Sequence, residues 1–581
     1  MMWKSRPRRL FGFNRRDFLR IAPAGVAAGV LPGVAESQPS NAITTNHLRS
    51  ASELADLEFT EIEHELMRGA IRRNRERYAT LRNLPIPSDT EPALTFQPFM
   101  SGDRPTGGAT PQSALPIRGP ELPDVPDNIE DLALQPVTVL SRLVERREVT
   151  STDLTTMYLN RLNRYGDTLN CVITLTPELA LLQAARADQE IQTGRYRGPL
   201  HGIPWGAKDL LATRGVRTTW GAKPYEFQII DSDATVVQRL QDAGAVLVAK
   251  LSMGALAQGG VWFGGSTRNP WDVSRSSSGS SAGPAAATAA GLVGFSIGTE
   301  TLGSIISPSN ACGVAGLRPT YGRVSRHGAM ALSWTMDKIG PMCRGVEDCA
   351  LVFNSIYGSD GYDETVVDAP FLWDTGFQVS RLRVGYIASE LDLPPNGTSS
   401  EQRRLWLAQR EVLQEALSKF RELGVALEPI ELPDFPADAL RLILDAEAAT
   451  AFDDLTRTRG IDDLTRQGPG AWPNRFRSAR FIPATEYIRA QRARTLLGRE
   501  MAVLMTDYDA FVSPTLSQSL VVTNLTGHPA VAIKAGFRDG LPVGLMITGR
   551  LYEESTILQL AAAYEQVTPW HTMHPGDFDP F

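Results

Sequence analysis

A lysine and two serines, each in a glycine-rich segment, are the residues of this chain best suited to chemistry. Lys208 ends His201-Gly-Ile-Pro-Trp-Gly-Ala-Lys208, Ser280 lies in a run of serines and glycines, and Ser304 ends Gly298-Thr-Glu-Thr-Leu-Gly-Ser304. A serine hydroxyl becomes a nucleophile when a base takes its proton. A lysine amine can be that base near pH 7 if burial lowers its pKa. The three segments therefore suggest a hydrolase that uses lysine in place of histidine.

The surroundings of Lys208 and Ser304 favour strand ends. Lys208 follows a mostly apolar segment, which predicts a strand entering the interior, although a Lys208-Asp209 pair taken alone is usually solvated. The apolar run at 292–297 leads into the turn before Ser304. Such a turn points successive backbone amides the same way, and each amide can stabilise an oxyanion by ~3–4 kcal/mol. An ordinary glycine and serine loop is the other interpretation of this motif.

A second serine motif offers a competing nucleophile. Gly279-Ser-Ser281-Ala-Gly283 matches the G-x-S-x-G elbow, which would make Ser281 the nucleophile of an α/β-hydrolase. An elbow follows a hydrophobic strand, whereas the upstream residues Trp271-Asp-Val-Ser-Arg-Ser-Ser-Ser278 are polar and turn-like. The elbow hypothesis is therefore the weaker one.

The elements that must position these residues alternate between helices and apolar strands. Helices are expected around 139–144, from Thr150-Ser-Thr-Asp153 through Leu162, and over the alanine-rich 285–290. Strands are expected at 245–250 and 292–297, and a strand pair at 529–533 and 541–547 flanks an Asp539-Gly540 turn. This alternation predicts an α/β architecture. The mostly helical segment 360–500 and the loop 254–265 are expected to wall the substrate pocket.

Together these segments resemble the amidase signature family. Its lysine motif, its serine- and glycine-rich signature and its nucleophile turn occur here in the same order. Flanking segments agree, namely Thr267-Arg-Asn-Pro-Trp-Asp272, Cys312-Gly-Val-Ala-Gly-Leu-Arg-Pro-Thr-Tyr-Gly-Arg-Val-Ser325 and Asn524-Leu-Thr-Gly-His-Pro-Ala-Val531. The resemblance covers about residues 130–575 and implies a large mixed β-sheet covered by helices on both faces.

The resemblance also implies a Ser-Ser-Lys triad. Ser304 is expected to attack an amide carbonyl and form an acyl-enzyme, Ser280, held with a cis peptide in this family, to relay the proton, and Lys208 to act as the final base. The oxyanion hole is expected to consist of the backbone amides of Thr301, Leu302, Gly303 and Ser304. No metal or organic cofactor is implied.

The expected function is hydrolysis of the C–N bond of a small-molecule carboxamide by a serine amidase. Esters and carbamates are further candidate substrates. Three alternatives stay open: an α/β-hydrolase that uses Ser281, a glutamine amidotransferase subunit, and a catalytically inactive binding or scaffold protein.

The chain departs from the common family pattern near Ser304. Leu302 stands where the family has a glycine, which is tolerable only if this residue has φ below zero. Glu300 replaces a frequent aspartate and Ile306 a frequent arginine. These changes remove no member of the triad, but because of them the substrate of a particular family member cannot be assigned to this chain.

The start of the chain resembles a twin-arginine export signal, which we assign to residues 1–36. Arg15 and Arg16 precede Phe18-Leu19 and a weak apolar run at 21–34, which is too short for a permanent membrane anchor. The protein is therefore expected to be exported, periplasmic or secreted. A disordered basic tail is the alternative.

Residues 37–128 are expected to form a helix and a proline-rich strap before the amidase domain at 129–581. Apolar residues at helical spacing predict one amphipathic helix from Ser52 to Leu81, with Ser52 as its cap. Prolines between 85 and 126 are too dense for regular structure. The helix is expected to dock on the main body or on a neighbouring subunit, so a homodimer stays open.

Composition excludes several classes of partner. The net charge of −7 and pI of about 5.7 over 581 residues give no basic stripe for nucleic acid. The four cysteines are too few for a disulfide scaffold, and whether any of them pair stays open. His64 lacks the second histidine of a zinc helix and is expected on a helix surface.

Overall fold

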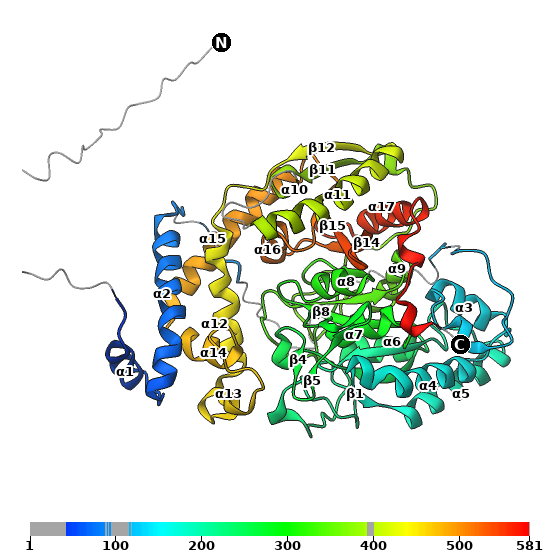
Figure 1. Ribbon diagram of the computed structural model, residues 1–581, viewed down its shortest axis with the longest axis horizontal. Coiled ribbons are helices and arrows are strands. Elements are labelled where there is room, and N and C mark those ends of the chain that lie inside the picture. The colour runs from blue at the N-terminus through cyan, green and yellow to red at the C-terminus, as the bar shows by residue number, and fades with distance from the viewer. Residues whose placement is uncertain are drawn as a thin grey trace, which may run out of the picture. The chain divides into compact units, whose positions relative to one another are not determined.

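The apolar runs that flank the candidate residues become strands of one mixed β-sheet (Figure 1). The computed structural model describes residues 42–87, 90, 92–94, 115–117, 119–391 and 400–579. In this part of the chain the sheet has eleven strands, in the order β1-β3-β2-β8-β10-β9-β14-β15-β13-β11-β12. These strands are β1 (Val172–Leu175), β2 (Pro204–Lys208), β3 (Val246–Leu251), β8 (Phe295–Glu300), β9 (Ala315–Arg318), β10 (Lys338–Cys343), β11 (Arg383–Ile387), β12 (Ala426–Ile430), β13 (Ala510–Pro514), β14 (Ala530–Arg538) and β15 (Leu541–Gly549).

Strand directions make the sheet mixed. β2 runs parallel to β3 and β8, and β11 runs parallel to β12 and β13, whereas β8, β10, β9, β14, β15 and β13 are successively antiparallel. Every residue of β2, β3, β8, β10 and β13 is buried, so both faces of the central sheet are covered. The predicted α/β class with a large mixed sheet is confirmed.

Helices surround this sheet. They are α1 (Thr45–Leu54), α2 (Glu61–Asn83), α3 (Val137–Glu145), α4 (Ser151–Leu169), α5 (Pro177–Gln192), α6 (Thr235–Asp242), α7 (Ala282–Ala289), α8 (Ile306–Cys312), α9 (Val346–Ile356), α10 (Ala388–Leu391), α11 (Ser400–Glu422), α12 (Leu442–Ala451), α13 (Asp453–Arg457), α14 (Trp472–Ala479), α15 (Ala484–Leu504), α16 (Gln518–Thr526) and α17 (Glu554–Gln566). Two short hairpins lie outside the sheet, β4 (Val261–Trp262) with β5 (Gly265–Ser266) and β6 (Arg268–Asn269) with β7 (Asp272–Ser276).

Several local predictions are confirmed. Thr150 caps α4, since its hydroxyl accepts the amide of Asp153 at 3.0 Å. β14 and β15 are the predicted strand pair, and their turn places Asp539 and Gly540 at φ of 52° and 76°. The segment 360–500 is mostly helical, but β11 and β12 also lie in it.

The prediction of a single helix from Ser52 to Leu81 is wrong. The structure has two helices, α1 and α2, separated by a turn in which Asp56 takes φ of 53°. Ser52 is not a cap but lies inside α1, where its hydroxyl donates to the Leu48 carbonyl at 2.8 Å. The apolar periodicity continues across the break, so periodicity alone could not reveal it.

A capping box starts the second helix. The Thr60 hydroxyl accepts the Glu63 amide at 3.3 Å, and the Glu63 carboxylate accepts the Thr60 amide at 2.6 Å. The expectation that His64 lies on a helix surface is also wrong. His64 is buried, and its Nε2 lies 3.1 Å from the Ser52 hydroxyl, so it joins α2 to α1. Among the described residues no cluster of three or more His, Cys, Asp or Glu side chains is arranged to hold a metal ion.

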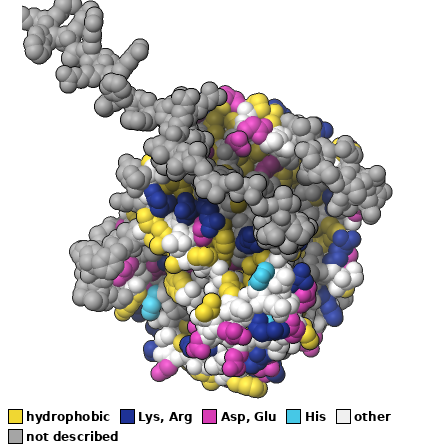
Figure 2. All heavy atoms as spheres, turned by 90° about the vertical axis from the view of Figure 1, so that its left-hand side faces the viewer, with side chains coloured by type: hydrophobic (Ala, Val, Ile, Leu, Met, Phe, Trp, Pro, Cys, Tyr) yellow, Lys and Arg dark blue, Asp and Glu magenta, His cyan; other side chains and the backbone are white. Residues whose placement is uncertain are grey.

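α2 docks on the main body through ion pairs. By its contacts the chain divides into Met1–Thr44 and Thr45–Phe581, and α2 belongs to the second unit, where it contacts α14 and α15. Arg82 pairs with Glu486 at 2.6 Å, and Glu63 pairs with Arg477 at 2.7 Å. Figure 2 shows both acidic and basic side chains on the face that carries these helices.

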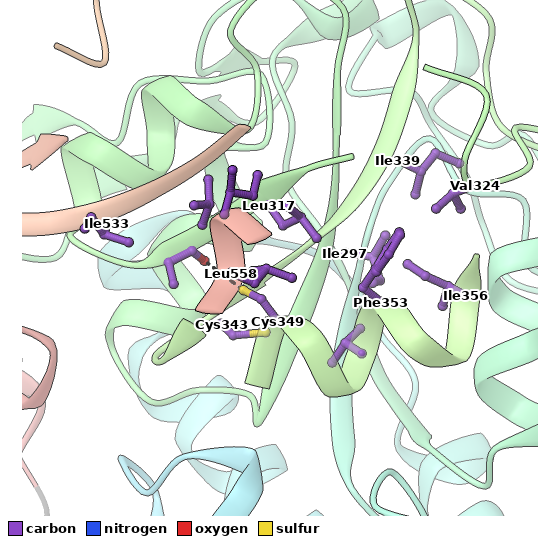
Figure 3. Packing of buried hydrophobic residues seen from close by; sticks show 14 of the residues in the cluster. Ile297, Leu317, Val324, Ile339, Cys343, Cys349, Phe353, Ile356, Ile533 and Leu558 are labelled. Carbon is purple, nitrogen blue, oxygen red and sulfur yellow. Dashed lines mark hydrogen bonds between the residues drawn. The ribbon is translucent and has the colours of Figure 1, made fainter. Parts of the chain in front are cut away.

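The core beneath the central strands is closely packed and contains cysteines. Cys343 of β10 and Cys349 of α9 lie side by side among Leu317 and Leu558 (Figure 3). All four cysteines are buried free thiols. The described helices include none with the length and hydropathy needed to cross a bilayer. The predicted export signal at 1–36 lies outside the described residues.

Candidate active site

Lys208 is the last residue of β2 and lies wholly inside the protein. β2 is flanked by the parallel strands β3 and β8, and the Lys208 side chain has no exposed surface. Asp209 is the first residue of the turn that follows β2. Its carboxylate pairs with Lys250 of β3 at 3.3 Å. The neighbouring carboxylate therefore does not neutralise the Lys208 amine.

The Lys208 amine donates to hydroxyl and carbonyl oxygens from two segments. Its Nζ lies 2.8 Å from Ser280 Oγ, 3.0 Å from Ser281 Oγ, and 2.9 Å from the Thr299 Oγ1. Burial lowers the pKa of Lys208 from 10.5 to about 7, although the charges of Asp337 and Glu300 act in the opposite direction. Near neutral pH a large share of the protein therefore carries an uncharged amine here.

The two adjacent serines differ in their hydrogen bonds. The Ser281 hydroxyl also donates to the Thr299 carbonyl at 3.1 Å and accepts the Thr299 amide at 3.2 Å, so it joins α7 to β8. The Ser280 hydroxyl has Lys208 as its one partner within the described chain. The Ser280 oxygen can therefore accept a hydrogen bond from a further hydroxyl, whereas Ser281 is committed to the backbone of β8. The peptide bond between Gly279 and Ser280 is cis.

Ser304 lies in the turn between β8 and α8 and is partly exposed. The amide of Ser281 donates to the Ser304 carbonyl at 3.2 Å, which brings the segment with Ser280 and Ser281 against the turn that holds Ser304. No hydrogen bond joins the side chains of Ser280 and Ser304 in the described part of the chain. The structure thus unites Lys208 with Ser280 directly and places Ser304 beside them through the backbone.

The predicted oxyanion turn has the backbone that its sequence requires. Gly303 takes φ of 99°, which favours glycine, while Leu302 is not among the residues with positive φ. Leu302 can therefore replace the family's glycine without strain in this turn. Within the described chain no acceptor binds the amides of Thr301, Leu302, Gly303 or Ser304, so these amides are available to a developing oxyanion.

Glu300 holds the end of this turn, where α8 begins. Its buried carboxylate accepts the amides of Ile305 and Ile306 at 2.7 and 2.9 Å and pairs with Arg318 at 2.9 Å. Asn524 donates to the same carboxylate at 2.7 Å. Although burial alone would raise it, the Arg318 guanidinium and the Ile306 amide hold the pKa of Glu300 below its usual value. The sequence pointed to Glu300 only as a departure from the family pattern, not as an anchor.

Asp337 holds the start of this turn, at Thr301, and the sequence analysis did not predict this role. Its carboxylate accepts the Thr301 hydroxyl at 2.5 Å and the amides of Leu332 and Ser333 at 2.8 and 2.9 Å. Burial raises the pKa of Asp337. Asp337 directly precedes β10, the strand that pairs with β8, and this pairing is what a single sequence does not reveal.

A pocket of about 390 Å³ adjoins the site at Thr299, Thr301 and Asp337. The expectation that its walls come from 254–265 and 360–500 is only partly right, because most of the wall comes from residues 326–339. The lining residues are Leu210, Ala257, Thr299, Thr301, Arg326, His327, Ala329, Met330, Ala331, Leu332, Trp334, Asp337, Lys338, Ile339, Tyr362, Asp363 and Glu364.

The structure also argues against Ser281 as the nucleophile of a G-x-S-x-G elbow. Upstream of Ser281 lies β7, an exposed strand of a two-stranded hairpin that belongs to no central sheet. Ser281 itself is buried with its hydroxyl engaged by Lys208 and Thr299. This arrangement lacks the buried strand and the exposed hydroxyl that a nucleophile elbow requires.

The chain is similar to several known proteins. Residues 153–521 match the family described as Amidase. The chain is 35% identical to a subunit of the glutamyl-tRNA(Gln) amidotransferase of Moorella thermoacetica, over 75% of this chain and 97% of that protein. It also resembles the native peptide amidase of Stenotrophomonas maltophilia, with 31% identity, a TM-score of 0.66, and coverage of 78% of this chain and 100% of that chain.

Proposed function

Because the chain belongs to the amidase family and is an amide-hydrolysing enzyme, we propose that it is a serine amidase that acts through an acyl-enzyme on Ser304. The observation that carries this proposal is the buried Lys208 amine, 2.8 Å from a serine hydroxyl that lies beside a turn with free amides. A neutral amine in this position can accept a proton that an adjacent hydroxyl passes on.

The first half of the reaction forms the acyl-enzyme. As the Ser304 oxygen bonds to the substrate carbonyl carbon, its proton passes to Ser280, and the Ser280 proton passes to Lys208. The carbonyl electrons move onto oxygen, where the amides of Thr301, Leu302, Gly303 and Ser304 stabilise the negative charge. When the C–N bond breaks, the proton returns from Lys208 through Ser280 to the departing nitrogen, and an amine leaves.

The second half releases the acid. Water attacks the ester carbonyl of acylated Ser304 and loses its proton through the same Ser280 and Lys208 relay. The C–O bond to Ser304 then breaks, Ser304 recovers a proton, and a carboxylic acid leaves. Esters and carbamates present the same carbonyl to Ser304, so we include them as candidate substrates.

Two serine variants test this assignment. Ser304→Ala is expected to lower kcat/KM for amides by at least about 10³-fold, because no nucleophile remains. Ser281→Ala is the matched control, and we expect it to lower the activity about tenfold at most, because the Ser281 hydroxyl contacts Lys208 but takes no part in the proton relay. Butyryl amides, butyryl esters and N-butylcarbamates form the substrate panel. Full activity in Ser304→Ala, or abolition by Ser281→Ala alone, would overturn the proposal.

A second candidate function is favoured by the names of curated relatives. Eight of them are glutamyl-tRNA(Gln) amidotransferase subunits at 33–35% identity. An amidotransferase subunit of this kind would release ammonia from glutamine. Glutamine hydrolysis faster than that of any simple amide in the panel would favour this candidate over the amidase.

We also propose export, which rests on the sequence around Arg15 and Arg16 alone. Replacing both by lysine is expected to retain the protein in the cytoplasm of a host with twin-arginine transport. Immunoblots of cell fractions would report the change, and equal export of both forms would contradict the proposal.

A further inference from the structure

The pocket described above adjoins the Lys208 end of the site rather than the end of the turn where α8 begins. Thr299 and Thr301 form part of its wall, and Leu210, two residues after Lys208, forms another part. The side chain of Thr299 also binds the Lys208 amine, at 2.9 Å. One residue thus contacts both the base and the pocket.

This position corresponds to the nitrogen side of a bound amide. In the proposed reaction, which this inference presupposes, the proton held by Lys208 returns to the leaving nitrogen. The leaving nitrogen must therefore face the Lys208 and Ser280 end of the site, while the carbonyl oxygen faces the amides of 301–304. A group attached to that nitrogen would extend along Thr299 and Thr301 into the pocket.

Several charged groups in the pocket wall are already bound to their neighbours. Arg326 binds Asp363 at 2.7 Å and 2.9 Å, and it also donates to the Trp334 carbonyl at 2.5 Å. Asp337 accepts three hydrogen bonds from its own surroundings. Glu364 and the stacked pair His327 and Tyr362, whose ring centroids lie 4.4 Å apart, border the pocket. Lys338 donates to the Met336 carbonyl, and the apolar part of the wall includes Leu210, Met330, Leu332, Trp334 and Ile339.

The wall is also held rigidly before any substrate binds. Glu447 of α12 accepts the Ser333 hydroxyl at 2.5 Å and the Thr335 amide at 3.1 Å. Arg494 of α15 donates to the Thr335 carbonyl at 2.8 Å. Trp334, between these two anchored residues, is 47% exposed and lies in the pocket wall. It presents an aromatic face that a planar substituent can stack on.

The volume distinguishes two classes of amide. A primary amide releases ammonia, which is about the size of a water molecule, and water takes up about 30 Å³ in the liquid. The pocket of about 390 Å³ instead falls in the range of small-molecule sites. We infer that the substrate is a secondary amide whose nitrogen carries an apolar or aromatic group, and that this group occupies the pocket beside Thr301, Leu332 and Trp334.

The test compares leaving groups at a constant acyl group. Hydrolysis of butyramide, N-propylbutyramide and butyranilide is measured for the full chain and for Ala331→Phe, which adds a ring to the partly exposed pocket wall. Wild-type kcat/KM is expected to be highest for butyranilide. In Ala331→Phe the ratio of butyranilide to butyramide kcat/KM is expected to fall at least about tenfold. Trp334→Ala is expected to lower the same ratio by removing the stacking surface.

Two controls separate this inference from the proposed function. Leu372→Ala, an exposed apolar residue outside the pocket, is expected to leave the ratio unchanged. The ratio between hexanoyl and butyryl anilides is expected to stay within about twofold in Ala331→Phe, because the acyl group lies elsewhere. An altered acyl ratio with an unchanged amine ratio overturns the inference, while loss of activity in Ser304→Ala would still uphold the proposed function.

A second readout covers the case in which none of these amides is hydrolysed. Phenyl and methyl N-butylcarbamates would carbamylate Ser304, and intact mass would report the rates in wild type and Ala331→Phe. A selective loss of the phenyl rate in the variant supports the inference. Equal rates for wild type and variant with both carbamates overturn it, and so does failure of both to label Ser304.

Discussion

Activity is predicted to fall steeply below pH 7, because the proposed base is a buried lysine that works only as a neutral amine. Burial lowers the pKa of Lys208 from 10.5 to about 7. A base with this pKa is about half neutral at pH 7, about 10% neutral at pH 6 and about 1% neutral at pH 5. We therefore predict that kcat/KM rises about tenfold per unit below pH 7 and levels off above pH 8.

The assay measures butyranilide hydrolysis from pH 5 to pH 9 at constant ionic strength. Lys534→Met is the matched control, since burial also lowers the pKa of Lys534 to about 7. Lys534 lies on β14, four strands from β2 in the sheet order, and its amine donates to the Met573 carbonyl at 2.6 Å. The control is expected to keep the acid limb of the profile. A midpoint above pH 9 in wild type, or loss of the limb in Lys534→Met, would refute the reasoning.

Three further changes test individual contacts. Ser280→Ala removes the proposed proton relay. Steady-state kinetics are expected to show kcat lowered by at least about 10³-fold with KM changed less than threefold. Retention of a tenth of the wild-type kcat would argue against a relay. Glu300→Gln places an amide nitrogen among four hydrogen-bond donors and leaves the buried Arg318 guanidinium without a carboxylate. The free energy of unfolding in urea is therefore expected to fall by about 3–5 kcal/mol. A fall below about 1 kcal/mol would contradict this. Asp348→Ala removes the acceptor of the Val137 and Thr138 amides at the start of α3, which has no cap of its own; the expected cost in the same assay is about 1–2 kcal/mol, and an unchanged midpoint would count against this remote cap.

The parts of the fold that local sequence determines could be predicted. β14, β15 and the cap of α4 follow from apolar runs, turn residues and a threonine three residues before an aspartate. The candidate site could be located because Lys208, Ser280 and Ser304 stand in characteristic segments. The sequence also required Leu302 to take φ below zero, and Leu302 is not among the residues with positive φ.

The parts that depend on tertiary pairing could not be predicted. Thr299 reaches the base because β8 pairs with β2, and Asp337 reaches the oxyanion turn because β8 pairs with β10. Both pairings join segments that are far apart in the sequence. The pocket wall at 326–339 follows from the pairing of β8 with β10. The break between α1 and α2 was missed for a different reason, since a capping box at Thr60 interrupts an apolar pattern that continues on both sides.

The central claim is that the Lys208 amine activates Ser304, and covalent labelling tests it most directly. An alkyl fluorophosphonate is incubated with wild type and with Lys208→Ala, and the adduct is located by peptide mass mapping. Wild type is predicted to gain one phosphonyl group on Ser304, whereas Lys208→Ala is predicted to gain none in the same time. An adduct on Ser281, or equal labelling of both proteins, would contradict the account.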